Sequence, residues 1–351
     1  MGHYYINDGK QMKLTDNILR IIRNAKVYIK ISSFLMEDEL IVSELCKVST
    51  SGKAAVFVIS NRNNKEGEEY KSSTDNKENV NAEGIHTHQM FLQRLFYSGV
   101  HVRLLDNLHA KFIIGDGEEG ILMSANIASN SLIKNVETGI DVNGKDLKDL
   151  ELIFDTMYNY ADIVQFVKSD KSDVVKKSIR KMPDSVFDGI IGNIKLTAIS
   201  KYNTNLSECY KTSLYESILN IIDDAHSFVY IFSWVFKDKN RTLGRLQKSI
   251  NNALKRGVKV TLFYNRRVTS YNQPLQESFI YEMGSKGCDA YCNTNNHSKC
   301  ILSEKEGLLF TANIDGNNGL LEGFEVGCMM DNEQHEQALK HVRELITKAK
   351  I

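Results

Sequence analysis

Hydrophobic positions along the chain follow two alternating periodicities. Apolar residues recur three and four positions apart in residues 14–22 and again in residues 214–222, which predicts two amphipathic helices. Each helix leads into a nearly continuous apolar run, 27–34 or 228–236, which indicates a buried strand. Further helices are predicted over 38–48, 147–160, 242–255 and 335–349, and further strands over 55–59 and 258–264. Strands that alternate with helices favour an α/β sandwich with a mixed β-sheet.

The order of these elements occurs twice. Asn17–Ala25 (NILRIIRNA) matches Ser217–Ala225 (SILNIIDDA), 200 residues later. Gly99 and Gly287, each expected just before a strand, are 188 residues apart, so the first half contains about twelve additional residues. An internal repeat predicts two similar α/β/α lobes, most economically related by a pseudo-twofold axis. We expect an N-terminal lobe over 1–162, a connector without a counterpart over 163–212, and a C-terminal lobe over 213–351.

Composition narrows the class of protein without naming a function. Lysine plus arginine and aspartate plus glutamate both number 44, so the net charge is zero and a polyanionic partner would need a local basic patch. The first twenty residues show no signal-peptide pattern, and no apolar run is long enough to span a membrane. The six cysteines fit neither zinc nor redox spacing and are expected to be buried thiols in a reducing compartment. We therefore expect a cytoplasmic protein.

A set of polar residues is repeated in both halves. His109 and Lys111 are two positions apart, as are His297 and Lys299, and residues two apart in a strand share a face. Each pair is followed by a carboxylate, a hydroxyl, an amide and a second carboxylate, which are Asp116, Ser124, Asn126 and Glu137 in the first half and Glu304, Thr311, Asn313 and Glu325 in the second. Two copies predict one symmetric site between the lobes.

These residue types suit phosphoryl transfer. One neutral imidazole can attack phosphorus while a second, protonated imidazole donates a proton to the leaving alkoxide. The lysines and asparagine amides can stabilise charge on the non-bridging oxygens. Glu137 and Glu325 are placed to orient the imidazoles through a hydrogen bond at the second ring nitrogen. No carboxylate cluster with metal-site spacing accompanies the histidines, so we expect no metal and no cofactor.

The doubled His-x-Lys-x4-Asp/Glu pattern with its trailing Ser/Thr-x-Asn resembles the phospholipase D superfamily. The resemblance implies two α/β/α lobes with the site at their interface, and a metal-free reaction through a phosphohistidine. It implies that His109 and His297 are nucleophile and general acid, in either order, and that the lysines and asparagines bind the phosphate. Asp116 and Glu304 are implied to have a structural role beyond the site. Neither the Glu at 304 nor the alanines between each Ser/Thr and Asn remove a reacting group, so an active enzyme is expected.

The substrate is less closely defined than the chemistry. Our first interpretation is a nuclease acting on DNA or RNA, with Arg266 contacting substrate at a strand end. The alternative is a phospholipase or phosphatidyl transferase at a membrane surface, and a second alternative is a non-catalytic nucleic-acid-binding module. The basic segment Lys168–Lys181 either binds a phosphate backbone or is only a solvated connector. The sequence leaves the oligomeric state and a partner protein open.

Three further features have simpler interpretations. Asn61–Gly84 is polar and predicts a loop that could gate the site. His86 and His88 are expected to be solvated histidines and not a metal pair. Phe34 and Trp234, at equivalent strand positions, are expected to pack in the core.

Overall fold

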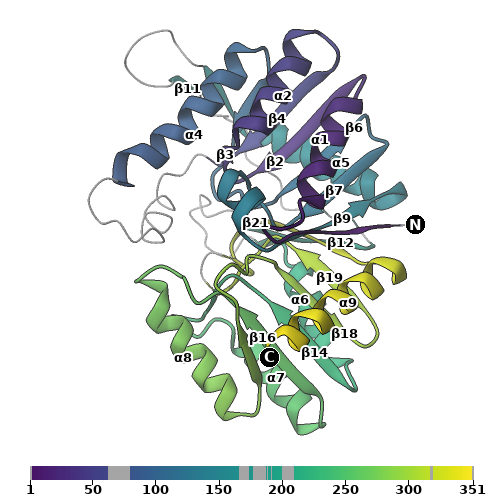
Figure 1. Cartoon of the computed structure of the whole chain (residues 1–351), viewed down its shortest axis with the longest axis vertical. Coiled ribbons are helices and arrows are strands. Elements are labelled where there is room, and N and C mark those ends of the chain that lie inside the picture. Colours follow the sequence, from purple (N-terminus) through teal and green to yellow (C-terminus); the bar gives the residue numbers. More distant parts are fainter. Residues whose placement is uncertain are drawn as a thin grey trace.

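The computed structural model describes residues 2–61, 80–165, 174–176, 187, 189–190, 192–199, 209–316 and 319–349. Two lobes lie one above the other along the long axis, with helices on the outer faces of their sheets (Figure 1). The predicted segment Lys168–Lys181 lies outside the described residues except for 174–176. Most of the predicted loop Asn61–Gly84, including Arg62, also lies outside them.

The first lobe is built on a nine-stranded sheet in the order β1-β9-β7-β6-β2-β4-β5-β10-β11. Its strands are β1 (Tyr4–Asn7), β2 (Tyr28–Ser33), β4 (Ala55–Ser60), β5 (His101–Leu104), β6 (Phe112–Gly115), β7 (Glu119–Met123), β9 (Glu137–Val142), β10 (Asp162–Gln165) and β11 (Val174–Lys176). Its helices are α1 (Lys13–Asn24), α2 (Glu39–Thr50), α4 (Val80–Tyr97), α5 (Gly144–Tyr160) and a π-helical turn, η1 (Asn130–Lys134). The short strands β3 (Met36–Glu37) and β8 (Ile127–Ala128) pair beside the main sheet.

The second lobe repeats this plan in an eight-stranded sheet, β13-β12-β21-β19-β18-β14-β16-β17. Its strands are β12 (Ile194–Ile199), β13 (Cys209–Lys211), β14 (Phe228–Phe232), β16 (Lys259–Tyr264), β17 (Asp289–Cys292), β18 (Cys300–Ser303), β19 (Gly307–Phe310) and β21 (Gly323–Met329). Its helices are α6 (Ser213–Asp223), α7 (Gly244–Lys255), α8 (Asn272–Ser285) and α9 (Asn332–Ala349). The short pair β15 (Phe236–Lys237) and β20 (Ile314–Asp315) corresponds to β3 and β8.

The two sheets confirm the predicted mixed α/β architecture with two similar lobes. The strands β9-β7-β6-β2-β4-β5 occupy the same relative positions in the first sheet as β21-β19-β18-β14-β16-β17 occupy in the second. β2 pairs with β4 in parallel and with β6 antiparallel, and β14 pairs with β16 and β18 in the same way. The repeated helix-then-strand pattern in the sequence therefore produces the same mixed sheet twice.

One part of the connector does have a counterpart, contrary to the prediction. β12 pairs antiparallel with β21, with Thr197 opposite Glu325, as β1 pairs with β9, with Asn7 opposite Glu137. Residues 194–199 therefore take the place of β1 in the second sheet. The sequence comparison missed this because the two strands share no residue pattern, only a position in their sheets.

Apolar residues form three buried clusters that hold the lobes together. One cluster lies within each lobe, where α1 and α2, or α6 and α7, cover one face of the sheet. The third is shared: Phe112 and Phe154 of the first lobe belong to the same cluster as Leu302 and Phe324 of the second. Burial of a large aromatic or aliphatic side chain contributes about 1.5–3 kcal/mol. The shared cluster therefore fixes the two sheets against each other, which positions everything at their junction.

Two findings bear on the expected environment of the protein. None of the described helices combines the length and the apolar character needed to cross a lipid bilayer. Of the described cysteines, Cys292 is exposed and four are buried, and all five are free thiols.

Candidate active site

The two histidines lie at the junction of the lobes, each just ahead of a central strand. β6 begins at Phe112, so His109 and Lys111, which the sequence predicts to share a strand face, belong to the segment leading into this strand. The backbone N–H of His109 donates to the carbonyl of Phe324 (2.9 Å), and that of His297 donates to the carbonyl of Val136 (3.0 Å). Each histidine segment is thus held by the other lobe, beside β9 and β21 at the junction (Figure 1).

The orienting carboxylates cross between the lobes. Glu325 Oε1 lies 2.7 Å from Nδ1 of His109, and Glu137 Oε1 lies 2.7 Å from Nδ1 of His297. Both glutamates are fully buried, and the second oxygen of each accepts a 2.5 Å hydrogen bond from a hydroxyl, Ser124 for Glu137 and Thr311 for Glu325. Because Nδ1 of each ring is engaged, Nε2 is the nitrogen that can face a substrate. Each of these two pairs therefore takes its histidine from one lobe and its carboxylate from the other.

Two lysines supply positive charge to the same place. Lys111 and Lys299 are fully buried. Lys111 Nζ donates to the carbonyl of His109 (2.6 Å), and Lys299 Nζ donates to the carbonyl of His297 (2.9 Å) and lies 3.2 Å from its Nδ1. Burial lowers the pKa of Lys299 to about 8, opposed by the charges of Glu137 and Glu325. A buried ammonium loses its hydration, so these lysines are poised to gain stability from a bound anion.

The two asparagines are positioned by a serine at the end of a neighbouring strand. Ser33 Oγ accepts from the backbone N–H of Ile127 (3.0 Å), and Ser233 Oγ accepts from that of Ile314 (2.9 Å). These residues directly follow Asn126 and Asn313. The side-chain oxygens of both asparagines are buried and have no hydrogen-bond partner within the described part of the chain. Buried polar atoms normally have partners, so the two amides are arranged for a group that binds there.

The two histidine–glutamate pairs differ electrostatically. Burial, together with the charges of Lys111 and Lys299, lowers the pKa of His109 well below its usual range. Burial also lowers the pKa of His297, but the charge of Glu137 opposes that shift. Burial raises the pKa of Glu325 to about 7, whereas the charge and contact of His297 outweigh burial and hold the pKa of Glu137 below its usual value. The Glu137–His297 pair therefore stabilises a protonated imidazole better than the Glu325–His109 pair does.

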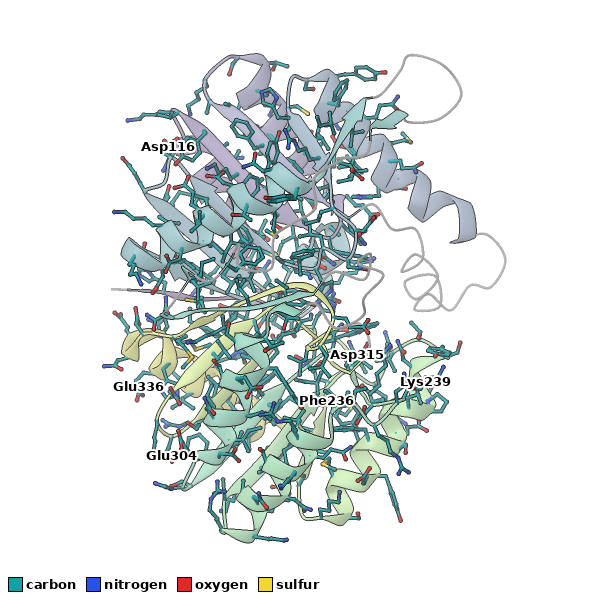
Figure 2. The ribbon with its side chains drawn as sticks, turned by 180° about the vertical axis from the view of Figure 1, so that it is seen from behind. Asp116, Phe236, Lys239, Glu304, Asp315 and Glu336 are labelled. Atoms are coloured by element: carbon teal, nitrogen blue, oxygen red, sulfur yellow. The ribbon has the colours of Figure 1, made fainter. Side chains whose placement is uncertain are left out.

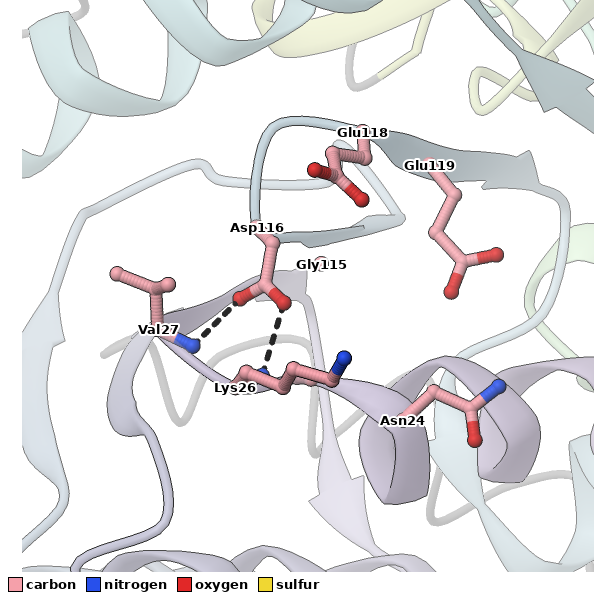
Figure 3. A pocket seen from close by; sticks show the side chains of 8 residues that line it. Asn24, Lys26, Val27, Gly115, Asp116, Glu118 and Glu119 are labelled. Carbon is pink, nitrogen blue, oxygen red and sulfur yellow. Dashed lines mark hydrogen bonds between the residues drawn. The ribbon is translucent and has the colours of Figure 1, made fainter.

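Asp116 and Glu304 lie far from the junction, at the outer parts of the two lobes (Figure 2). The carboxylate of Asp116 accepts 2.8 Å hydrogen bonds from the backbone N–H groups of Lys26, Val27 and Tyr28, two of which are drawn in Figure 3. Glu304 does the same for His226, Ser227 and Phe228 at 2.7–3.3 Å. Both carboxylates therefore fix the start of the strand, β2 or β14, that runs toward the histidines. The surface hollow beside Asp116 is lined by Glu118, Glu119 and Asn24 and is not part of the junction.

Two predictions about aromatic and histidine side chains were wrong. The ring centre of Phe34 lies 5.5 Å from that of His109, and the ring centre of Trp234 lies 5.8 Å from that of His297. Phe34 is buried, as predicted, whereas Trp234 is partly exposed beside the site. His88 is only partly exposed and not simply solvated: its Nδ1 accepts from the backbone N–H of Met36, and desolvation lowers its pKa to about 4. Gln276, 188 residues later, binds the equivalent N–H of Phe236, so the repeat spacing is the signal that could have identified this role.

Arg266, which the sequence predicts to contact substrate, lies at the edge of the site. Its side chain is exposed just after β16, and no contact with His109 or His297 occurs among the described residues. Its neighbour Asn265 is closer to the site, because its amide donates to the carbonyl of Asn296, one residue before His297 (3.0 Å). Arg266 therefore borders the site without lining it.

Residues 18–158 match a family model described as "Cardiolipin synthase, PLD-like domain". The match lies within the first lobe, so that lobe resembles a phospholipase D-like domain. The second lobe repeats its central strand order and its polar residues, so the predicted resemblance to the phospholipase D superfamily is confirmed. No curated protein sequence matches the chain. In the described residues, no group of three or more histidine, cysteine, aspartate or glutamate side chains gathers in the geometry of a metal site.

Solved structures share the phospholipase D-like fold at low sequence identity. Phosphatidylserine synthase from Haemophilus influenzae Rd KW20 is 12% identical with a TM-score of 0.64, and the match covers 99% of this chain and 86% of that one. Polyphosphate kinase from Porphyromonas gingivalis is also 12% identical with a TM-score of 0.57, and the match covers 97% of this chain but only 49% of the kinase. The phospholipase D family member Nuc from Salmonella typhimurium is 15% identical with a TM-score of 0.37, and covers 51% of this chain and 100% of its own. This chain thus spans about half the length of the kinase, and the likenesses to the synthase and the kinase show the fold alone.

Proposed function

We propose that this protein is a metal-independent phosphodiesterase that reacts through a phosphohistidine and hydrolyses nucleic acid. The observation that carries the proposal is the crossed pair of buried histidine–carboxylate contacts, each 2.7 Å long, beside two buried lysines. Two imidazoles held in this way, with two ammonium groups and two amides around them, suit an in-line displacement at phosphorus. The phospholipase D-like domain in the first lobe supports phosphodiester chemistry in general.

The reaction proceeds in two displacements. In the first, Nε2 of one neutral histidine attacks phosphorus, the P–N bond forms, and the P–O bond to the leaving alcohol breaks. The departing alkoxide takes a proton from Nε2 of the other, protonated histidine. In the second, that histidine removes a proton from water, the hydroxide oxygen bonds to phosphorus, and the P–N bond breaks. Lys111, Lys299 and the amides of Asn126 and Asn313 stabilise the negative non-bridging oxygens in both steps.

The electrostatic difference between the pairs supports one assignment of the roles. His109, whose pKa lies furthest below its usual value, is the neutral nucleophile. His297 faces Glu137, whose own pKa is held low and which therefore stays ionised, so His297 is the general acid. A substrate with a good leaving group, such as bis(p-nitrophenyl) phosphate, needs no general acid. His297→Ala should therefore still give a burst of one p-nitrophenol per enzyme and accumulate base-stable, acid-labile phosphohistidine, whereas His109→Ala should give neither. The reverse pattern would exchange the roles.

Exposed cations at a strand end favour nucleic acid as the substrate. Arg266 and Arg267 follow β16. The carboxyl end of this strand lies beside two segments, one that carries Trp234 and one that carries His297. The carboxyl ends of parallel strands commonly border the ligand crevice in α/β folds. Guanidinium groups there suit a substrate with several phosphates along its length.

Phosphatidyl transfer is the second candidate. It is favoured by the family model itself, whose description names cardiolipin synthase. In that reaction a lipid alcohol replaces water in the second displacement, with the same histidines. A non-catalytic nucleic-acid-binding module, the third possibility, would bind without turnover.

A substrate panel separates these functions. Wild type is assayed with single- and double-stranded DNA, RNA, phosphatidylcholine and cardiolipin, beside His109→Ala, His297→Ala and the control His226→Ala. His226 is exposed and its side chain lies at the far end of the second lobe, near Glu304. We expect nucleic-acid hydrolysis that both site variants abolish and the control retains. Activity on lipids alone would favour phosphatidyl transfer, and binding without turnover would favour the non-catalytic module.

A further inference from the structure

The positive charge of this neutral chain is concentrated in one segment of the second lobe. Between His226 and Gln276 the sequence contains ten lysines and arginines and a single acidic residue, Asp238. Four of the cations, Lys239, Arg241, Arg266 and Arg267, are exposed on the two loops that follow β15 and β16. We call these four residues the basic surface.

The basic surface is continuous with the candidate active site. Asn265, which precedes Arg266, donates from its backbone N–H to the carbonyl of Trp234 (3.3 Å) and from its amide to that of Asn296 (3.0 Å). Trp234 in turn contacts the ring of His297. The loop carrying Lys239 and Arg241 is anchored on the other side, because Gly316, three residues after Asn313, donates to the carbonyl of Lys237 (3.3 Å). Figure 2 shows Lys239 at the edge of the lobe, on the opposite side from Glu304.

Two of the acidic groups near these loops are already engaged. Asp238 accepts hydrogen bonds from the backbone N–H groups of Thr242 (2.7 Å) and Leu243 (3.0 Å). Asp315 is buried in an ion pair with Lys237, 3.0 Å long. The field above the two loops is therefore dominated by exposed ammonium and guanidinium groups, which attract an anionic chain.

An aromatic ring is held among the cations. Tyr271 is 55% exposed, and its hydroxyl accepts a 2.9 Å hydrogen bond from Lys239, whose ammonium lies 5.4 Å from the ring centre. Trp234 is partly exposed between this loop and His297. Aromatic rings combined with a basic surface are the arrangement that binds unpaired bases by stacking while cations contact the phosphates.

Within the described residues, the first lobe differs at the loop that follows β3, the counterpart of the loop that follows β15. At the positions of Lys239 and Arg241, 200 residues earlier, it has Glu39 and Ile41. Glu39 is paired with Arg94 at 2.7 Å, and Ile41 is fully buried. The pseudo-symmetry of the site is therefore broken in charge, which gives a bound polyanion one preferred direction away from His297.

We propose that the basic surface, with Tyr271 and Trp234, binds single-stranded nucleic acid and leads it across the second lobe to the histidines. This inference rests on the proposed phosphodiesterase function and specifies its substrate class. Duplex DNA keeps its bases stacked inside the helix, so it cannot use the two rings and should bind more weakly. The unpaired strand extends over β15 and β16, with its scissile phosphate at the junction.

The test measures binding separately from turnover. The full-length His109→Ala variant is the background. Its affinity for a fluorescein-labelled oligothymidine is measured by fluorescence anisotropy at several salt concentrations. The same measurement is made after also introducing Arg266→Ala/Arg267→Ala or Lys239→Ala/Arg241→Ala. Each pair should weaken binding about tenfold and lower the slope of log affinity against log salt by about 1.4, since each phosphate contact contributes about 0.7. The matched control is Lys255→Ala/Lys259→Ala, which removes two exposed cations of the same segment from the opposite end of β16 and should change neither.

The rings and the chemistry have their own controls. Tyr271→Ala should weaken binding about tenfold, whereas Tyr281→Ala, which truncates an 80% exposed tyrosine farther along α8, should not. Equal effects of the matched variants, or tighter binding of duplex than of single strand, would overturn the inference. The inference would also fail if the protein bound phosphatidylglycerol vesicles but not oligothymidine, and if the same variants weakened that vesicle binding. Bis(p-nitrophenyl) phosphate is too small to reach the basic surface. Its hydrolysis by wild type without oligothymidine binding would therefore reject this inference and leave the proposed reaction standing, and loss of that hydrolysis would reject the reaction itself.

Discussion

Replacing Glu137 by glutamine tests whether the cross-lobe carboxylate acts through His297. The substitution keeps the shape of a fully buried side chain and its hydrogen bond with Ser124, but removes the charge 2.7 Å from Nδ1 of the imidazole. A hydrogen bond to a charged group contributes about 1.5–3 kcal/mol. Loss of that stabilisation from the imidazolium should therefore lower kcat/KM by about 10- to 150-fold.

The same change should move the pH profile in a defined direction. The charge of Glu137 raises the pKa of His297, so its removal lowers that pKa further. The general acid is needed in its protonated form, and the limb of kcat/KM that falls with deprotonation of His297 should move to lower pH. A purely structural role for Glu137 would lower activity at all pH values without moving this limb.

Glu325→Gln is the matched comparison. Burial raises the pKa of Glu325 to about 7, so near neutral pH this carboxyl group carries less negative charge beside His109 than Glu137 carries beside His297. The loss of kcat/KM at pH 7 should therefore be smaller than for Glu137→Gln, with thermal unfolding measured for both variants. Equal losses, or an unmoved limb in Glu137→Gln, would refute the reasoning that the two pairs differ.

Other consequences can be checked with simple variants. Lys299 loses its charge as pH rises through about 8, so kcat/KM should fall further there, and Lys299→Arg should remove that additional fall from the pH profile because guanidinium stays protonated. Asp116→Ala leaves three backbone N–H groups without their acceptor and should cost about 1–2 kcal/mol of stability in urea unfolding, with kcat per folded molecule unchanged. The pKa of Asp116 is lower in the folded than in the unfolded protein. Its contribution to stability is therefore present above the unfolded-state pKa and should be lost as pH falls through the folded-state pKa. If the stability of wild type and of Asp116→Ala fell in parallel at acid pH, this reasoning would be contradicted. Turnover should persist in excess EDTA, because protein cations supply the charge stabilisation, and complete loss that Mg²⁺ restores would reject the metal-free reaction.

The sequence by itself determined the repeated elements and the types of residue at the site. Helical spacing in residues 14–22 and 214–222 predicts α1 and α6, because an amphipathic stripe reflects local backbone geometry. The doubled His-x-Lys pattern likewise locates the reacting groups, since local spacing decides which side chains share a face. Both patterns lie within a few neighbouring residues, so they can be recognised without knowing which distant segment packs against them.

Only the tertiary structure decided which segments meet. Nothing in the chain order indicates that Glu325 faces His109 while Glu137 faces His297, because the crossing arises from how one sheet packs against the other through the shared cluster. For the same reason β12 was mistaken for part of a connector: an edge strand is defined by the neighbour it pairs with. The predictions for Trp234 and His88 were wrong because the surroundings of these side chains depend on which distant strands and helices close around them.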